Sequence, residues 1–318
     1  MVVVGQIARD LVLVVDEVPG PGGTAGVRRR RELLGGKGAN QAVALAQLGM
    51  SVGLVGVVGE DEVGERLLDQ IRRDGIDDSL VVRRSGEVTG LIVDVVEGTG
   101  RWRYLEDLPG PMLLSEADVA AAADRLRAAQ WVSVQLQQPS AAVRAAVTLA
   151  RDAGVRVALD GVPEEEHREE LLAAADVVRA DAKEAELLVG ARLEGVEAAV
   201  RAGRELLRCG PSLVALAVES GGNVFVWTGG HLALPLIETP VKDTTGAGDA
   251  FTAALVAGLA RGFSPEQTAF LAVAAAATTV GHPGGRPELT SQGLHDMLER
   301  VESPPDAEVP HAKSAQWT

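Results

Sequence analysis

The sequence predicts an α/β domain built on a mainly parallel β-sheet, with helices on both faces and a small flap of antiparallel strands at one edge. Short apolar runs alternate with helix-length segments, and the runs are nearly continuous in Val, Leu and Ala, which is typical of strands covered on both faces. Strand–helix–strand repetition favours parallel pairing with right-handed crossovers. Two segments, residues 10–34 and 87–106, break this repetition with alternating strands and turns, and we expect them to form the flap.

Six apolar runs are expected to be the buried strands of the main sheet. They are Val2–Val4, residues 52–58, 131–136, 155–159 and 177–178, and Leu213–Val218. A strand-like stretch over residues 234–241 leads into the last glycine-rich segment of the chain.

The helices between these runs have recognisable ends. Three of them are expected over residues 117–129, 141–152 and 266–280, and begin after Ser115, Ser140 and Ser264. Asp118 completes a capping box with Ser115, and Pro265 takes the first helical position after Ser264. Gly154 ends the second helix.

The flap contains one predicted hairpin and one basic run. Residues 91–96 and 101–105 are expected to pair as a hairpin, because turn residues separate the two alternating strands. The arginines at 28–31 are interpreted as a solvated strand face, with a phosphate contact from a lid as the alternative. The residues from 303 to 318 carry prolines and polar residues without periodicity, so we expect a disordered tail after a single domain of residues 1–302.

Composition limits the partners of the protein. Acidic residues outnumber basic ones by 45 to 30, for a formal net charge of −15, which disfavours nucleic acid and anionic membranes as partners. A phosphate-binding site must therefore create positive potential locally. The single cysteine, Cys209, excludes an internal disulfide. We expect a cytoplasmic protein, because the start of the chain has no signal-peptide pattern and no apolar run spans a bilayer.

A glycine-rich turn opens a helix late in the chain, in the run Gly246-Ala247-Gly248-Asp249. Glycine permits close approach of the backbone to a ligand, and the first amides of a helix have no intrahelical partner, so this turn is suited to bind a phosphoryl group. Asp249 has two interpretations. It caps the helix, or it is a general base that accepts a proton from a substrate hydroxyl.

A second glycine-rich turn, Gly35-Gly36-Lys37-Gly38-Ala39-Asn40, opens a helix over residues 39–48. It is not a Walker A loop, because Gly38 stands where that loop has Ser or Thr after its lysine. Lys37 and Asn40 are donors that could bind hydroxyl groups.

Together these two segments closely resemble the two signatures of the ribokinase-like, or PfkB-type, carbohydrate kinase family. The first signature covers residues 35–49 and the second residues 243–251, and the likeness runs from about Val2 to about Leu289. The resemblance implies a three-layer αβα fold with a small β-sheet lid and the transfer of a phosphoryl group from ATP to a sugar hydroxyl. It also implies Mg²⁺ and K⁺ as cofactors and a homodimer formed through the lid.

The resemblance also implies a role for each matching position. Asp249 would be the general base, and Gly246, Ala247 and Gly248 would form the anion hole. The sugar would be held by Asp10, Gly35, Gly36, Lys37, Asn40 and Gln137. Asp181, Ser220 and Gly222 would hold the nucleotide, and Glu184 would bind Mg²⁺ through water. Asp243 and Thr245 would form a monovalent-cation site with carbonyls of residues 280–285.

Four positions depart from the family pattern. Ala8 replaces an asparagine that contacts the sugar, and Gln137 replaces a glutamate typical of ribokinase. Asp181 replaces the asparagine of an Asn-x-x-Glu motif, and Glu219 stands in a nucleotide loop that retains only its last glycine, Gly222. These departures affect the residues that choose the sugar and hold the nucleotide.

Three functions are consistent with these residues. The first is an ATP-dependent sugar kinase, and the alternatives are a nucleoside kinase of the same family and a catalytically weak sugar-binding relative. A nicotinamide oxidoreductase is excluded, because the residues after the first strand, from Gly5 to Asp10, lack the Gly-x-Gly-x-x-Gly fingerprint.

Overall fold

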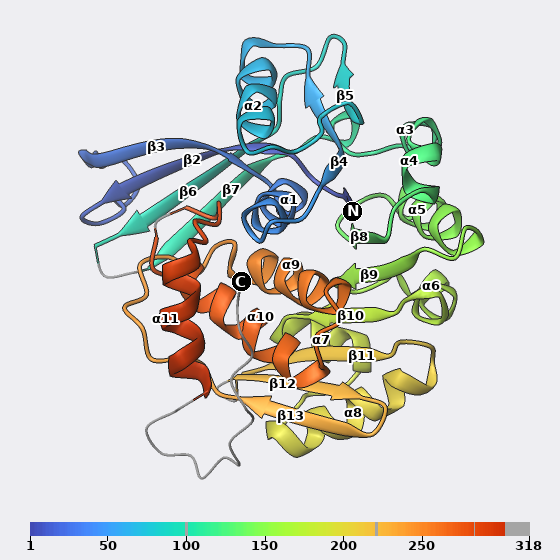
Figure 1. The fold of residues 1–318 in the computed structure, drawn as a ribbon. Helices are drawn as coiled ribbons and strands as arrows, with labels where there is room; N and C mark the ends of the chain where they lie inside the picture. The colour runs from blue at the N-terminus through green and yellow to red at the C-terminus, as the bar shows by residue number, and fades with distance from the viewer. Residues whose placement is uncertain (99–100, 220–221, 283, 303–318) are drawn as a thin grey trace.

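The computed structural model describes residues 1–98, 101–219, 222–282 and 284–302, and within them nine strands form one sheet (Figure 1). Six neighbouring pairs are parallel, and the last two pairs at one edge are antiparallel. The strands lie in the order β13 (Gly230–Leu234), β12 (Gly222–Trp227), β11 (Leu213–Val218), β10 (Val177–Ala180), β9 (Arg156–Asp160), β8 (Trp131–Gln135), β1 (Val2–Val4), β4 (Gly53–Gly59) and β5 (Val81–Arg84). The mainly parallel sheet expected from the six apolar runs is confirmed.

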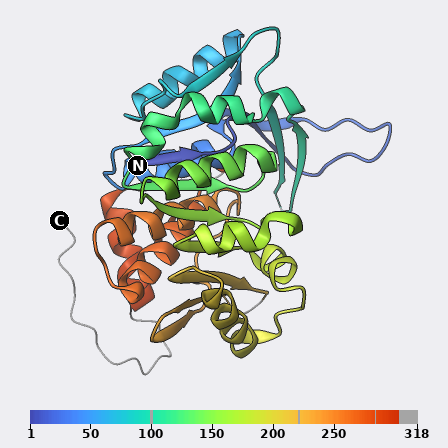
Figure 2. The same cartoon turned by 90° about the vertical axis from the view of Figure 1, so that its right-hand side faces the viewer.

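Helices cover both faces of this sheet, and each face has its own apolar cluster. One face carries α1 (Lys37–Gln47), α2 (Glu62–Arg73), α9 (Ala247–Ala260), α10 (Pro265–Thr279) and α11 (Ser291–Glu302). The other face, which is turned to the viewer in Figure 2, carries α3 (Glu116–Ala121), α4 (Ala123–Arg127), α5 (Ser140–Asp152), α6 (Arg168–Ala174), α7 (Ala182–Val189) and α8 (Gly195–Arg208). Short 3₁₀ turns, η1 (Gly110–Met112) and η2 (Glu165–His167), lie between these elements.

A second, smaller sheet projects from the main body, as predicted for the flap (Figure 1). Its strands lie in the order β3 (Val27–Gly35), β2 (Ala8–Val15), β6 (Leu91–Glu97) and β7 (Trp102–Asp107). The predicted hairpin is present as β6 and β7. The expectation of a wholly antiparallel flap is wrong, because β2 and β6 pair in parallel. The long connection between them, which passes through α1, β4 and α2, permits that direction.

Three local expectations differ from the structure. Ser140 does not cap α5, since it lies inside the helix and the N-cap position is Pro139. The helix predicted over residues 117–129 is broken at Ala122 into α3 and α4. The stretch after Leu234 is not a strand, because Pro235 and Pro240 lack amide hydrogens for a ladder.

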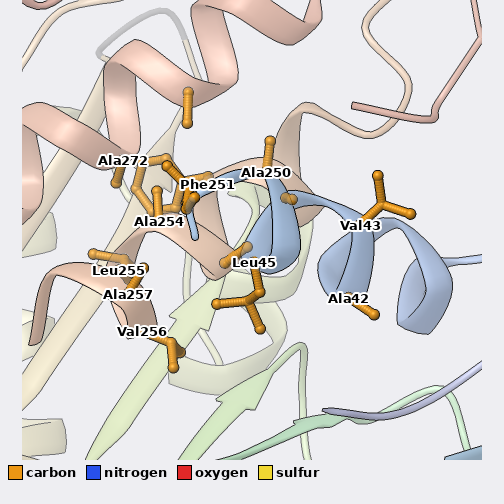
Figure 3. Packing of buried hydrophobic residues seen from close by; sticks show 14 of the residues in the cluster. Ala42, Val43, Leu45, Ala250, Phe251, Ala254, Leu255, Val256, Ala257 and Ala272 are labelled. Atoms are coloured by element: carbon orange, nitrogen blue, oxygen red, sulfur yellow. The ribbon is translucent and has the colours of Figure 1, made fainter. Parts of the chain in front are cut away.

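Helices α1 and α9 pack closely through small side chains, and this packing positions the two glycine-rich turns. Figure 3 shows Leu45 of α1 in one apolar cluster with Ala250 and Ala254 of α9. At the start of α1, a Cβ added to Gly38 would lie only 2.5 Å from the carbonyl carbon of Gly5. The turns that open α1 and α9 therefore meet beside the carboxyl ends of the parallel strands, where ligands bind in open α/β sheets.

Some expectations lie outside this description or stay predictions. Residues 303–318 are outside the described residues, and the single domain of residues 1–302 stays a prediction. In the described chain, no helix has both the length and the apolar character needed to cross a bilayer. Of the basic run, Arg28, Arg29 and Arg30 are exposed as expected for a solvated strand face, whereas Arg31 pairs with Glu288 at 3.2 Å.

Candidate active site

A cavity of about 420 Å³ lies between the small sheet and the starts of α1 and α9. The small sheet contributes side chains from β2, β6 and β7, and the main body contributes the two glycine-rich turns and the carboxyl end of β10. The lining residues predicted from the sequence are Asp10, Gly36, Lys37, Asn40, Gln137, Asp181, Thr245, Gly246, Ala247, Gly248 and Asp249. Two motifs about 200 residues apart in sequence thus share one cavity.

The turn that opens α9 has room only for glycine. Gly246 has a φ of 72°, and a Cβ added there would lie 1.7 Å from the carbonyl oxygen of Gly285. Gly246 is the N-cap of α9, and its position makes the first amides of the helix available to a ligand. The macrodipole adds partial positive charge at the same point, so the turn can bind an anion.

Asp249 is the third residue of α9 and is only 6% exposed. The N-cap of this helix is Gly246, without a side-chain capping bond, so Asp249 does not hold the N-cap position. Its Oδ2 accepts a hydrogen bond of 3.0 Å from Nδ2 of Asn40, which α1 brings into the cavity. Burial and the charge of Asp160 raise the pKa of Asp249 to about 7, against the lowering effects of Lys37 and Asn40. A carboxyl group with such a pKa can accept a proton near neutral pH.

Asp10 lies on β2 near Asp249 and is 4% exposed. It lies over the backbone of Gly35, where a Cβ would be 1.9 Å from the Asp10 carboxyl carbon. The glycine at 35 therefore makes room for the Asp10 side chain. Burial, together with the charges of Asp249 and Asp243, raises the pKa of Asp10 to about 7.

Sequence reasoning missed a buried ionic network beneath the anion-binding turn. Nη1 of Arg179 donates to Oδ1 of Asp160 at 3.0 Å, and Asp160 also accepts hydrogen bonds from Gln41 and Thr252. The Arg179 guanidinium touches the turn itself, since a Cβ added to Gly248 would lie 2.6 Å from Nη2. A basic residue at the carboxyl end of a buried strand, just before the Asp181 motif, was the available signal.

The residues predicted to hold Mg²⁺ and nucleotide begin α7. Asp181 and Glu184 form a reciprocal capping box, with amide-to-carboxylate distances of 2.8 and 2.9 Å. Glu184 also lies 3.7 Å from Nζ of Lys37 and 3.8 Å from Nη1 of Arg179. Asp181 lines the cavity directly, and Glu184 lies behind Lys37.

The predicted monovalent-cation residues organise the loop before α9. Oδ1 of Asp243 accepts hydrogen bonds from the amide and the hydroxyl of Thr245, at 2.9 and 2.6 Å. Its Oδ2 accepts from the amide of Gly284 at 2.8 Å. The carbonyl of Val280 accepts a hydrogen bond from the amide of Lys242. Within the predicted range of residues 280–285, Pro283 lies outside the described residues.

The small sheet contributes a second group of residues that sequence reasoning did not select. They are Ile92, Asp94, Trp102, Tyr104 and Glu106. The Tyr104 hydroxyl contacts the Thr245 hydroxyl, which joins this sheet to the loop before α9. Burial and the nearby Asp243 raise the pKa of Asp94 to about 8. The signal for Asp94 was a single acidic residue within the apolar run of residues 91–96.

Of the predicted nucleotide residues, Asp181 lines this cavity and Gly222 does not. Ser220 lies outside the described residues. Gly222 begins β12 with a φ of 82°, and a Cβ there would lie 2.2 Å from the carbonyl oxygen of Leu234. This close contact between strands requires glycine at position 222. Gln137 does line the cavity, and its carbonyl accepts a hydrogen bond from the Gln6 side chain at 3.2 Å.

Comparisons with known proteins agree on one family. A family model described as pfkB family carbohydrate kinase matches residues 1–291. The sequence is 28% identical over 302 residues to a ribokinase of Haemophilus influenzae, covering 95% of this chain and 99% of that protein. It is 30% identical over 309 residues to an ATP-dependent ribose-1-phosphate kinase of Halopiger xanaduensis, covering 92% of this chain and 96% of that protein. The structure of an Arabidopsis thaliana ribokinase complexed with ribose and ATP matches with a TM-score of 0.77 and 27% identity, over 94% of this chain and 98% of that chain.

Proposed function

The chain belongs to the pfkB family of carbohydrate kinases and is a sugar kinase, and we propose that Asp249 is the general base of its reaction. The reaction moves the terminal phosphoryl group of ATP to a hydroxyl of a small sugar. The observation that carries the proposal is a buried carboxyl group, 6% exposed, that lies beside an anion-binding helix start and lines the cavity. Asp249 takes the proton of the acceptor hydroxyl while the hydroxyl oxygen attacks the phosphorus atom and ADP leaves.

The anion hole is assigned to Gly246, Ala247 and Gly248. They form the start of α9, and amides there would donate to the transferring phosphoryl group, where negative charge accumulates in the transition state. Donors that are already oriented need no rearrangement during the reaction, which is why such groups contribute strongly to rate.

Arg179 completes the phosphoryl side of the cavity, where its guanidinium lies against Gly248. We assign Arg179 to the phosphate groups, because Asp160, Asp181 and Glu184, which lie near it, are acidic. The arginine offsets the charge that Asp181 adds where the family pattern has asparagine.

Carboxylate oxygens suit Mg²⁺, and Asp181 and Glu184 present them beside the cavity. Among the described residues no group of three or more His, Cys, Asp or Glu side chains could hold a metal ion, which agrees with an ion held partly by water and by the nucleotide. Bound there, Mg²⁺ would neutralise charge on the phosphates. The nucleotide itself is assigned to Asp181, Ser220 and Gly222.

A potassium ion is assigned to the loop of Asp243 and Thr245. Asp243 is 3% exposed, and none of the described Lys or Arg side chains forms a salt bridge with it. Its charged neighbours Asp94 and Asp10 are also acidic, so a monovalent cation in this loop would compensate buried negative charge.

The acceptor side is assigned to Asp10, Gly35, Gly36, Lys37, Asn40 and Gln137. The relatives act on ribose or ribose 1-phosphate by name, and a small sugar is the acceptor that we propose here. A nucleoside is the second candidate, because Trp102 lines the cavity and is 46% exposed, which leaves an aromatic face for a base. A catalytically weak relative is the remaining alternative.

An ADP-release assay with a panel of sugars and nucleosides, with and without K⁺, tests the function. Turnover of a sugar that requires ATP supports the kinase, and the preferred acceptor separates sugar from nucleoside. Absence of turnover with every acceptor, together with normal ATP·Mg²⁺ binding in calorimetry, would favour the catalytically weak relative.

We also propose a homodimer through the small sheet and a cytoplasmic location, where ATP is available. Val27 and Leu105 on the two outer strands are 49% and 67% exposed, and unpaired edge strands with apolar side chains favour association. Light scattering on the purified protein measures the dimer directly, and a monomer at micromolar concentration would contradict it.

The fall of kcat/KM at low pH should reflect the protonation of Asp249. Because the base must be deprotonated and its pKa is raised to about 7, kcat/KM should fall about tenfold per pH unit below that value and level off above it. Steady-state rates from pH 5 to 9 in a non-chelating buffer series measure the profile. A flat profile over this range would contradict the assignment.

Arg179 should be required for both stability and rate. Arg179→Met leaves Asp160 buried without its cation, so we expect a loss of about 3–5 kcal/mol in unfolding free energy. Arg179→Lys keeps a cation but loses the planar fork, and kcat should fall about tenfold with little change in acceptor KM. Arg156→Lys is the matched control. Arg156 begins β9, at the other end of that strand from Asp160, and lies over the Trp131 ring, so this variant should keep the wild-type kcat. Equal kcat values for Arg179→Lys and this control would contradict the assignment of Arg179 to the phosphate groups.

A further inference from the structure

The inner face of the small sheet is acidic and aromatic, and its pattern follows from strand pairing. In the β6–β7 hairpin the cross-strand pairs Ile92–Glu106 and Asp94–Tyr104 alternate with pairs that point the other way. The members of these two pairs line the cavity, whereas Leu105, on the opposite face, is exposed. The hairpin therefore presents a carboxyl group to the acceptor from each strand.

Asp94 is buried but has no donor. It is 3% exposed, and neither of its carboxylate oxygens receives a hydrogen bond from a described residue. The nearest charged group is Asp243, which can accept a hydrogen bond from Asp94 only when Asp94 is protonated, and whose own oxygens already accept from Thr245 and Gly284. A buried acceptor without a donor costs about 1–3 kcal/mol, so an ionised Asp94 requires a donor from the ligand.

The same end of the cavity holds other unpaired acceptors. Oδ1 of Asp10 and Oδ1 of Asn40 are buried without a partner among the described residues. All of these oxygens accept hydrogen bonds when the carboxyl groups are ionised. The group that fits them must bring donors.

The cations of the cavity lie beside the anion-binding turn. Lys37 and Arg179 are the lysine and arginine among the described lining residues, and they pair with Glu184 and Asp160 beside the anion-binding turn. Arg101, just before β7, and Arg103, in β7, are bound to Glu97 at 2.7 and 2.6 Å and do not line the cavity. An anionic group on the acceptor would face carboxylates here without a counter-cation.

We propose that Asp94 is a specificity-determining residue, which selects acceptors that present hydroxyl or ammonium donors and carry no anionic group at this end of the cavity. This inference rests on the proposed kinase function and narrows its substrate class. Tyr104, held by its contact with Thr245, fixes the hairpin so that Asp94 faces the acceptor. Of the substrates named for the relatives, the geometry favours an acceptor like ribose over one like ribose 1-phosphate.

Acceptors on a common framework provide the first test. D-glucose, D-glucosamine and D-gluconate differ in charge, and D-ribose and D-ribose 1-phosphate form a second set. Binding is measured by calorimetry without ATP, and turnover by ADP release. Neutral or amino acceptors should exceed their anionic counterparts by about 100-fold in kcat/KM or in affinity, because the anion leaves buried acceptors unpaired. Preference for an anionic member, or no measurable binding of any neutral or amino probe, overturns the proposal.

Asp94→Asn provides the second test, because it keeps the shape of the side chain but cannot ionise. We expect the KM or Kd of the preferred acceptor to rise about 10-fold or more, the KM for ATP to stay within twofold, and the discrimination against anionic acceptors to shrink. Asp107→Asn is the matched control, since Asp107 is exposed on β7 and does not line the cavity. If Asp94→Asn loses more affinity for glucosamine than for glucose, the ammonium group is the donor to Asp94. An equal loss of affinity for the two identifies hydroxyl groups as the donors.

Two results of the second test overturn the inference without touching the kinase proposal. One is an acceptor KM that stays within twofold of the wild type in Asp94→Asn. The other is a change confined to the K⁺ concentration needed for activity, which would place Asp94 in the cation loop with Asp243. If the wild type binds neutral acceptors but phosphorylates none, the kinase proposal fails, while the calorimetric comparison still decides the role of Asp94.

Discussion

Asp249→Asn is expected to lower kcat by about 10²–10⁴-fold while the protein folds normally. The amide keeps an oxygen for the hydrogen bond from Asn40, which is 3.0 Å long in the wild type, but it cannot take the proton of the acceptor hydroxyl. Acceptor and nucleotide binding should change little, because the loss falls on the transition state. Rapid-quench or coupled steady-state assays measure kcat, and calorimetry measures binding.

Stability provides the control for this variant. The pKa of Asp249 in the folded protein, about 7, is higher than the ordinary value of 3.8 for an aspartate. The contribution of Asp249 to the unfolding free energy is therefore highest below about pH 4 and falls as the pH rises through 7, since ionisation is less favourable in the folded state. Asp249→Asn lacks this penalty and should be at least as stable as the wild type at pH 8. Asp152→Asn, at the exposed end of α5, should keep wild-type kcat. Near-normal turnover of Asp249→Asn would exclude Asp249 as the base.

Gly246→Ala is expected to reduce kcat by about 10²–10³-fold, because it displaces the amides of the anion hole. The added Cβ would lie 1.7 Å from the backbone carbonyl oxygen of Gly285. Neither atom can rotate away from the other, so the turn or the facing loop must move. Removing one oriented donor from such a site costs about 2.7–4 kcal/mol of transition-state stabilisation. The movement should also perturb Asp243, which holds the same loop through the amide of Gly284.

Gly262→Ala is the control for Gly246→Ala, because it introduces the same backbone strain without a steric clash. Gly262 follows the other end of α9, has a φ of 78° against 72° for Gly246, and would have no atom within 4 Å of a Cβ. Both substitutions place alanine in the left-handed region, at a cost of about 1–2 kcal/mol. Only Gly246→Ala should also lose activity, measured as kcat alongside thermal unfolding. If the two variants had similar kcat, the proposed anion hole would not depend on the geometry of this turn.

Local chemistry explains why much of the fold was predictable. Buried parallel strands require continuous apolar residues, and Val2–Val4 and Leu213–Val218 show them plainly. Helix starts depend on a few neighbouring atoms, so the capping box at Ser115 and the cap at Ser264 are present as expected. Ser140 has the same side chain but lies one residue inside α5, where its hydroxyl caps nothing. Residue type indicates a helix start, while backbone position decides whether the hydroxyl can cap it.

The sequence by itself determined the sheet, the two glycine-rich turns and the position of Asp249 in a helix start, because each depends on residues that are neighbours in the chain. Tertiary structure decided what surrounds that carboxyl group. The packing of α1 on α9 brings Asn40 to Asp249, the order of the strands brings Arg179 under Gly248, and the β6–β7 hairpin turns Asp94 into the cavity. These contacts join residues far apart in sequence, and their distances depend on how whole elements pack, which neither periodicity nor motif spacing encodes.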